Sequence, residues 1–320
     1  MSKPTIWISR KLSDNTQTRA TRDYDVILNH DDVISGADEI VAMSAKADAI
    51  LPCHSEIFDA GVVSRLSDRV KIIANHSVGV DHCDLAAFRQ RGIVVTNTPD
   101  VLSDSTAEIA MLLMLGAARR APEGDELVRS GKWKSWSPSF MVGTQVSGKR
   151  IGIIGMGRVG QVMARRCRGF DMEVHYHNRS RLPAQLEHGA TYHGTIETLL
   201  PVSDFVSLHC PATTATAGLM NAERLALLPK GSIVVNTARG ALIVEDDLVA
   251  AIRSGHIAAA GLDCFVNEPG GNPEFAHHAN IFMLPHIGSA TRETRDAMGF
   301  RALDNLDAFF AGKEPRDRLV

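Results

Sequence analysis

Short apolar runs rich in β-branched residues recur along the chain and alternate with helix-like stretches. This alternation predicts an α/β protein with parallel sheets wrapped in helices. In the first hundred residues we expect buried strands at 5–9, 25–28, 49–51, 71–74 and 92–96. A second set is expected at 150–154, 173–178, 204–210, 232–238, 258–264 and 281–286. The second set predicts a six-stranded, doubly wound sheet.

A long helical pattern separates the two sets, from Ser103 to about Gly131. Ser103 or Asp104 is a suitable N-cap, and Pro122 is expected to kink or break the helix. The stretch after Gly288 predicts one more helix without a strand of its own. We expect that helix to pack on the first domain. The expected domains are therefore 1–101 with 288–320, which makes the first one discontinuous, and 102–287.

Composition excludes several classes of protein. Hydrophobic residues make up 44% and charged residues 22%, and the net charge is −3. No basic field therefore indicates nucleic acid or an anionic membrane as a partner, and no apolar run reaches the length of a membrane span. The N-terminus lacks the apolar core of a signal peptide. Five scattered cysteines without a CxxC pair argue against disulfides and thiolate zinc sites, so we expect a cytoplasmic protein.

Thirteen histidines raise the question of a metal site. His175 and His177 would share one face of a strand, and His277 and His278 are adjacent. No carboxylate or thiolate set completes a ligand pattern around them. We therefore interpret them as solvated histidines of loops and strand ends, and expect no metal.

A GxGxxG motif consists of Gly155, Gly157 and Gly160. It follows the predicted strand RIGII and opens the predicted helix RVGQVMARRC, which is the context that dinucleotide binding requires. The first glycine permits a tight turn, the second lets the backbone approach a pyrophosphate, and the third allows close packing of helix on strand. The free N–H groups of the helix N-terminus would bind the phosphates.

The end of the next strand indicates which dinucleotide binds. NAD sites usually have an acid here for the ribose 2′-hydroxyl. This chain has Asn178, followed by Arg179, Ser180 and Arg181. Guanidinium groups can bind a 2′-phosphate that a carboxylate would repel. The sequence therefore favours NADPH, with NADH weaker, although the two arginines could also be merely solvated.

Three side chains with catalytic chemistry follow later predicted strands. Arg239 comes after one strand, Glu268 lies in the loop beyond Asp263 at the end of the next, and His286 ends the last. An arginine can bind a carboxylate and polarise a carbonyl, and a histidine can protonate the resulting alkoxide. A carboxylate beside that histidine favours imidazolium and orients the ring. Together they suggest reduction of a 2-keto acid.

These motifs resemble those of the D-isomer-specific 2-hydroxyacid dehydrogenases, and among them NADPH-dependent glyoxylate/hydroxypyruvate reductases. The resemblance runs nearly end to end. Its markers are SVGVDHCD (77–84), STAEIAM (105–111), GMGRVG (155–160), LHCPATTAT (208–216), NTARG (236–240), GLDCF (261–265), NEP (267–269) and PHIGSAT (285–291). It implies a Rossmann cofactor domain, 102–287, and a flavodoxin-like substrate-binding domain, with the active site in the cleft between them.

The resemblance also implies roles for individual residues. Arg239, Glu268 and His286 would be catalytic, and the substrate would contact Arg239, His286 and the backbone amides of Val78 and Gly79. Besides the residues of the glycine loop and of 178–181, the cofactor would contact Thr106, Arg158, Val159, Cys210, Pro211, Thr216, Thr237, Ala238, Asp263, His286 and Gly288.

The resemblance further implies a homodimer with the helix near 103–120 at the interface. Trp133, Trp136 and Phe140 would either reach the partner's active site or, as we favour, pack in the dimer interface or the core.

Several alternatives stay open. The substrate could be another 2-keto acid, such as 2-ketogluconate or phenylpyruvate, or a phosphorylated hydroxy acid or phosphite. Formate is disfavoured, because relatives that oxidise it carry Gln where Glu268 stands. The family also resembles corepressors that sense dinucleotides. Such binding proteins would be expected to carry long disordered extensions, and we expect almost none in this sequence. We therefore expect an enzyme whose partner is a small 2-keto acid.

Overall fold

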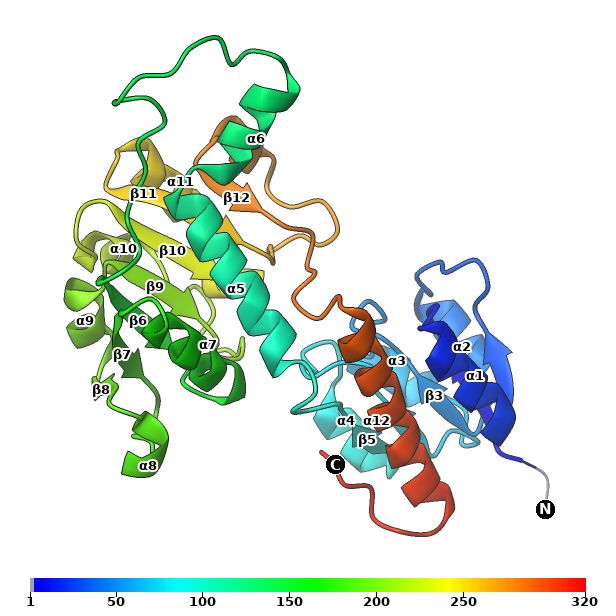
Figure 1. The fold of residues 1–320 in the computed structure, drawn as a ribbon. Coiled ribbons are helices and arrows are strands. Elements are labelled where there is room, and N and C mark those ends of the chain that lie inside the picture. The colour runs from blue at the N-terminus through cyan, green and yellow to red at the C-terminus, as the bar shows by residue number, and fades with distance from the viewer. Residues whose placement is uncertain (1–2) are drawn as a thin grey trace. The chain divides into compact units, whose positions relative to one another are not determined.

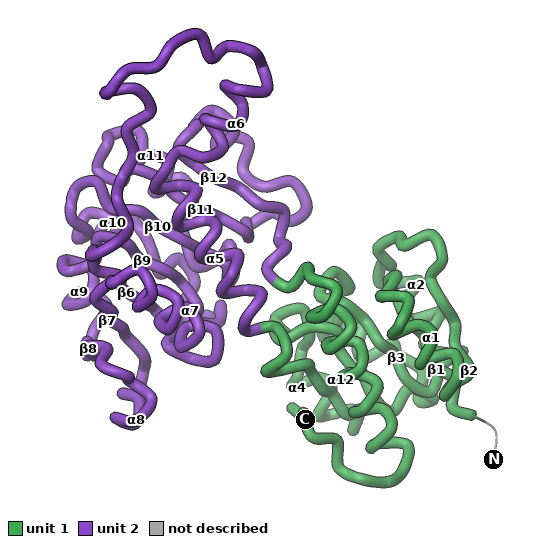
Figure 2. The backbone as a smooth tube through the Cα atoms, viewed as in Figure 1, with its two compact units in different colours: residues 1–102, 289–320 green, residues 103–288 purple. Residues whose placement is uncertain are grey.

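In the computed structural model, which describes residues 3–320, the chain divides into two compact units (Figure 2). Unit 1 comprises the residues up to Leu102 together with Ser289–Val320, and unit 2 is Ser103–Gly288. Each unit is an α/β domain built on one parallel sheet. No helix among the described residues is both long and apolar enough to cross a membrane.

Unit 1 contains a five-stranded sheet in the order β2-β1-β3-β4-β5. Figure 1 shows this sheet with helices around it. The strands are β1 (Thr5–Ile8), β2 (Asp25–Leu28), β3 (Ala49–Leu51), β4 (Ile72–Ala74) and β5 (Val94–Thr96), close to the expected ranges. The helices are α1 (Asp14–Asp23), α2 (Ala37–Ser44), α3 (Ala60–Arg65), α4 (Leu85–Arg91) and α12 (Arg292–Phe310). Helices α2, α3 and α4 pack on one face of the sheet, and α1 and α12 pack on the other.

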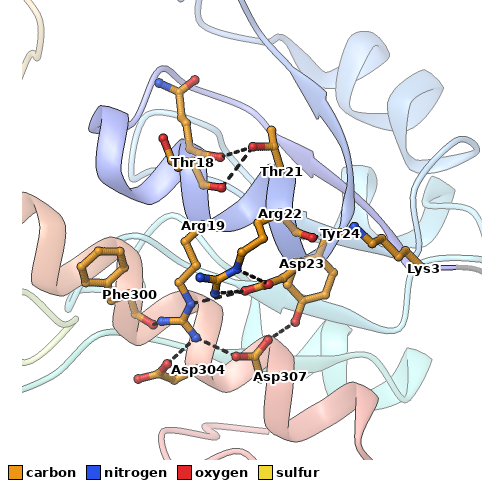
Figure 3. Close-up of polar contacts among 11 residues, drawn as sticks. Lys3, Thr18, Arg19, Thr21, Arg22, Asp23, Tyr24, Phe300, Asp304 and Asp307 are labelled. Atoms are coloured by element: carbon orange, nitrogen blue, oxygen red, sulfur yellow. Dashed lines mark hydrogen bonds and ion pairs between the residues drawn. The ribbon is translucent and has the colours of Figure 1, made fainter.

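The helix expected after Gly288 is α12, and it lies against α1 and β4 of unit 1. Its residues Ala302, Leu303 and Leu306 are completely buried in the core beneath α1. Polar contacts reinforce the packing at the edge (Figure 3). Arg19 of α1 forms ion pairs of 2.6 Å with both Asp304 and Asp307 of α12. The sheet of unit 1 is therefore covered by segments almost 300 residues apart in sequence.

Unit 2 contains a seven-stranded parallel sheet in the order β12-β11-β10-β9-β6-β7-β8. Its strands are β6 (Arg150–Ile154), β7 (Glu173–His177), β8 (Thr191–Tyr192), β9 (Phe205–Leu208), β10 (Ser232–Asn236), β11 (Ile257–Leu262) and β12 (Ile281–Met283). The expected number of six strands was wrong, because β8 is an edge strand of two residues with no apolar run to indicate it. The strand order reverses beside β6, the position where doubly wound sheets bind ligands.

Helices cover both faces of this sheet, over two separate hydrophobic cores. The helices of unit 2 are α5 (Ser103–Ala118), α6 (Ala121–Arg129), α7 (Arg158–Arg168), α8 (Ala184–Glu187), α9 (Ile196–Leu199), α10 (Ala222–Leu227) and α11 (Glu245–Arg253). Helix α6 contributes no buried residue and contacts α5. Short 3-10 turns occur at Leu200–Val202, Gly240–Leu242 and Pro273–His277. Helix α5 packs on α7 and on strands β10 and β11.

The long helical pattern divides into α5 and α6 before Pro122. Arg120 adopts a left-handed conformation (φ 55°), and Pro122 lies in the first turn of α6, where its missing N–H costs nothing. The expected N-cap at Ser103 or Asp104 was wrong, because both residues already belong to α5. Boundary shifts of one or two residues are the least predictable part of such a pattern.

Candidate active site

The loop between β6 and α7 has the geometry of a phosphate-binding turn. Gly155 has φ 97°, and a β-carbon there would lie 2.5 Å from the backbone nitrogen of Cys210. A β-carbon on Gly160 would collide with the carbonyl oxygen of Gly155, so α7 begins directly against the loop. A β-carbon on Gly157 would meet nothing within 4 Å. That open space lies at the N-terminus of α7 and fits a pyrophosphate approaching the backbone.

Asn178 follows β7 and is fixed to the glycine loop. Its Oδ1 accepts a hydrogen bond of 2.7 Å from the backbone N–H of Met156. Because the backbone N–H can only donate, the oxygen end of the amide faces the loop, and the NH₂ group faces the other way. The strand end therefore presents a neutral donor where an acid would accept from a ribose hydroxyl, and it carries no charge that would repel a 2′-phosphate.

The two arginines after Asn178 have different surroundings. Arg181 forms a bidentate ion pair with Glu187, with its Nε 2.8 Å from Oε1 and its Nη2 3.0 Å from Oε2. Arg179 is exposed, and within residues 3–320 its side chain has no ion pair. Ser180 between them is exposed as well. Sequence reasoning treated the arginines as equivalent, whereas the structure gives only Arg181 a counter-ion.

Asp263 at the end of β11 is 1% exposed and holds the loop that carries His286. Its two carboxylate oxygens accept from the backbone N–H groups of Ile287 at 2.8 Å and Gly288 at 2.7 Å. Burial raises the pKa of Asp263, and the two N–H donors oppose that rise. Thr106 adjoins the same point, since a β-carbon on Gly288 would contact both Asp263 and Thr106.

His286 and Glu268 form a hydrogen-bonded pair. Nδ1 of the ring donates to Oε2 of Glu268 at 2.6 Å, and Oε1 of Glu268 accepts from the backbone N–H of Phe265 at 2.7 Å. His286 has φ 53°, a conformation that costs a residue with a β-carbon about 1–3 kcal/mol. The bonds from Asp263 to the two residues after His286 help to hold it there. The carboxylate fixes the orientation of the ring through Nδ1.

Arg239 lies in a turn that packs on the loop carrying Glu268. Asn236, 1% exposed, donates from Nδ2 to the Arg239 carbonyl at 2.8 Å, while its Oδ1 accepts from the Ala238 N–H at 3.0 Å. A β-carbon on Gly240 would collide with the backbone of Phe265. Since Phe265 also binds Glu268, the turn after β10 and the loop after β11 form one packed assembly with the catalytic candidates.

The remaining predicted cofactor residues also lie beyond the strand ends of unit 2. Thr216 closes its own loop, accepting from the Thr213 N–H at 2.8 Å and donating to the Pro211 carbonyl at 2.7 Å. Thr237 is buried, and its hydroxyl has no hydrogen-bond partner among the described residues. The first turn of α7 starts with Arg158 and Val159.

In unit 1, the loop after β4 carries Val78 and Gly79. The carbonyl of Val78 accepts from Asn97 at 2.8 Å, and that of Gly79 accepts from the Ser77 hydroxyl at 2.7 Å. The carbonyl of Ser77 accepts from the Thr98 N–H at 2.9 Å. In a trans peptide the N–H points away from the carbonyl. The N–H groups of Val78 and Gly79 are therefore not consumed by the contacts that hold this loop, which suits them to bind an anion.

Sequence reasoning missed three residues that hold the site. Asn236 belongs to the NTARG motif, but no role was predicted for it from the sequence, although an Asn before a turn commonly hydrogen-bonds to the backbone of that turn. Glu245 at the start of α11 accepts from the Val266 N–H at 2.9 Å and so supports the Glu268 loop. Glu187 is separated from Arg181 by a loop, so no local pattern indicated their pairing.

The aromatic residues of the segment after α6 are exposed. Trp136 is 73% exposed, and Trp133 and Phe140 are also open to solvent in the single chain. The alternative that they pack in the core was therefore wrong, and the expected packing in a dimer interface stays a prediction. They lie in a stretch of turns without helix or strand, which has no core of its own to bury them.

Comparison with known proteins indicates the family to which this chain belongs. Residues 111–288 match the model of the D-isomer specific 2-hydroxyacid dehydrogenase NAD-binding domain. The chain is 41% identical to glycerate dehydrogenase of Hyphomicrobium methylovorum over 98% of each chain. It is 39% identical to glyoxylate reductase of Thermococcus litoralis, over 98% of this chain and 96% of that one.

Solved structures that are similar to this chain indicate the same family. A protein of Polaromonas sp. described under the same family is 42% identical, with a TM-score of 0.94 over 99% of this chain and 100% of that one. The NADPH-dependent glyoxylate/hydroxypyruvate reductase of Sinorhizobium meliloti, in complex with NADP and malonate, is 30% identical, with a TM-score of 0.88 over 100% and 97%. The chain therefore belongs to the D-isomer specific 2-hydroxyacid dehydrogenase family.

Proposed function

We propose that this 2-hydroxyacid dehydrogenase reduces a small 2-keto acid, glyoxylate or hydroxypyruvate, to the D-2-hydroxy acid, with NADPH as the preferred cofactor. The observation that carries the proposal is the 2.6 Å pair of His286 and Glu268, in which the loop of Glu268 packs against the turn of Arg239. Relatives named glyoxylate reductase and glycerate dehydrogenase support the same substrate class.

The glycine loop and the N-terminus of α7 would hold the pyrophosphate, with Asn178 and Arg179 at the ribose. The neutral Asn178 supports NADPH, since an acid there would repel the 2′-phosphate. Thr237 and Asp263 would bind the carboxamide end. The buried hydroxyl of Thr237 has no hydrogen-bond partner within residues 3–320, so it is a group that a ligand could satisfy.

The nicotinamide ring supplies the hydride when the dinucleotide is bound. Arg239 would polarise the substrate carbonyl and bind the neighbouring carboxylate, for which its planar fork is suited. The N–H groups of Val78 and Gly79 are the groups of unit 1 that we propose for the substrate carboxylate. His286 would then donate the proton on Nε2 to the carbonyl oxygen as it becomes an alkoxide, while Glu268 stabilises the imidazolium and fixes the ring.

We also propose a homodimer, in which the exposed Trp133, Trp136 and Phe140 meet the second copy. Large aromatic side chains left exposed together are a common mark of a protein interface. All five cysteines are free, which fits a reducing cytoplasm.

The direct test is a steady-state panel of kcat/KM values for glyoxylate, hydroxypyruvate, pyruvate, phenylpyruvate and 2-ketogluconate, each with NADPH and NADH. We expect the first two substrates to lead and NADPH to exceed NADH. A lead for phenylpyruvate or 2-ketogluconate would replace the substrate proposal. Tight dinucleotide binding without turnover of any 2-keto acid would favour the corepressor-like alternative.

A further inference from the structure

Glu187, the last residue of α8, is a buried carboxylate that the proposed mechanism does not use. It is 7% exposed. Its Oε1 accepts from the hydroxyl of Tyr176 at 2.6 Å and from Nε of Arg181 at 2.8 Å, and its Oε2 accepts from Nη2 of Arg181 at 3.0 Å. Arg168 at the end of α7 donates to the Glu187 carbonyl at 2.9 Å. Four donor contacts thus converge on one short helix.

The same residues frame the loop that follows β7. The Tyr176 hydroxyl, which donates to Glu187, accepts from the backbone N–H of Leu182 at 3.0 Å. At the other end of the loop, Asn178 is fixed by Met156, and its carbonyl accepts from the Tyr192 hydroxyl at 3.3 Å. The loop 178–182 is therefore anchored on both sides, and Arg181 is one of its anchors.

The two arginines of this loop differ in whether an acidic side chain neutralises their charge. Arg181 has a carboxylate within contact distance, so its positive field is largely cancelled at the range of a ligand. Arg179 has no acidic partner within the described residues and is exposed. A second, unpaired arginine would strengthen binding of a phosphate group but would add nothing for a ribose that lacks one.

We propose that Glu187 limits the cofactor selectivity of this protein by serving as the counter-ion of Arg181, which leaves Arg179 as the residue that recognises the 2′-phosphate. The proposal deepens the proposed function and rests on it. Glu187 acts through Arg181 and is a positioning residue. It makes the preference for NADPH moderate and keeps NADH usable.

The test separates the 2′-phosphate from the rest of the cofactor. Kd values for adenosine 2′,5′-bisphosphate and adenosine 5′-monophosphate are measured by calorimetry at one fixed ionic strength, and their ratio is the selectivity for the 2′-phosphate. Wild type is compared with Glu187→Gln, Arg181→Ala and Arg179→Ala. Glu314→Gln is the matched control, because it breaks an exposed Glu–Arg pair with Arg318 in unit 1.

We expect Glu187→Gln to raise the selectivity roughly threefold or more, because it frees the Arg181 charge while keeping an acceptor for Tyr176. Arg179→Ala should lower it about tenfold, Arg181→Ala should change it less than about twofold, and Glu314→Gln should leave it unchanged.

Unchanged selectivity in a folded Glu187→Gln variant would overturn the proposal. So would an equal loss of affinity for both nucleotides, which would reduce Glu187 to a structural support of the loop. An effect of Arg181→Ala as large as that of Arg179→Ala would contradict the division between the arginines. If the wild-type protein does not prefer the bisphosphate, the proposed NADPH preference is wrong. A higher selectivity for the 2′-phosphate in Glu187→Gln would still support the role of Glu187.

Discussion

Nδ1 of His286 donates to Oε2 of Glu268 across 2.6 Å, and we assign proton transfer to the other ring nitrogen, Nε2. His286→Ala is expected to lower kcat by about 10²–10⁴-fold, the usual contribution of general acid catalysis. Glu268→Gln should also lower kcat, because the amide no longer stabilises the imidazolium and its NH₂ group must face either Nδ1 or the Phe265 N–H, both of which donate to Glu268. Steady-state kinetics with glyoxylate and NADPH check this. Glu274→Gln, which removes a nearby exposed charge, is the control. Normal turnover in His286→Ala would refute the assigned role.

Gly155 and Gly157 are expected to respond differently to the same substitution. Gly155→Ala places a methyl group 2.5 Å from the backbone of Cys210 at φ 97°, so we expect a clear loss of stability. Gly157→Ala meets open space and should leave the thermal midpoint nearly unchanged, yet it should weaken dinucleotide binding because the methyl occupies the space meant for the pyrophosphate. Thermal denaturation and cofactor titration of the two variants give the comparison. Equal cofactor affinity in Gly157→Ala and wild type would place the pyrophosphate elsewhere.

Asp263→Asn is expected to disrupt the His286 loop although it changes only one atom. Both oxygens of Asp263 accept from backbone N–H groups, and the amide nitrogen of Asn would face one of those donors. A buried donor left without an acceptor costs about 1–3 kcal/mol. We expect a lower free energy of unfolding and a large fall in kcat. A variant with wild-type stability and turnover would show that these two bonds do not position His286.

The ion pair at Glu187 predicts a pH dependence of stability. Arg181 and the Tyr176 hydroxyl lower the pKa of Glu187 from its ordinary value of 4.5 to about 2. A lowered pKa means that the pair stabilises the folded state fully above the ordinary value, and that this stabilisation is lost as the pH falls toward about 2. The difference in Tm between wild type and Glu187→Gln should therefore be largest at pH 5 and above and should shrink below it. A difference that is independent of pH would contradict the ionic contribution.

The sequence predicted the strands well, because buried parallel strands are continuous apolar runs with distinct ends. It also predicted that Arg239, Glu268 and His286 follow strands of one parallel sheet, since residues at such strand ends meet at one edge of the sheet. Their catalytic chemistry stays a prediction. It could not predict the partner of Arg181, because that contact joins a loop to a helix through side-chain geometry alone. The edge strand β8 was missed for a related reason, as two residues carry no periodicity.

The contacts of α12 with α1 and β4 have a consequence for biosynthesis. Leu303 and Leu306 complete the core of unit 1, so that core cannot close until the chain as far as α12 has left the ribosome. Unit 2, which is continuous from Ser103 to Gly288, can fold earlier during translation. Unit 2 can thus form first, while one face of the unit 1 sheet is covered only by α1.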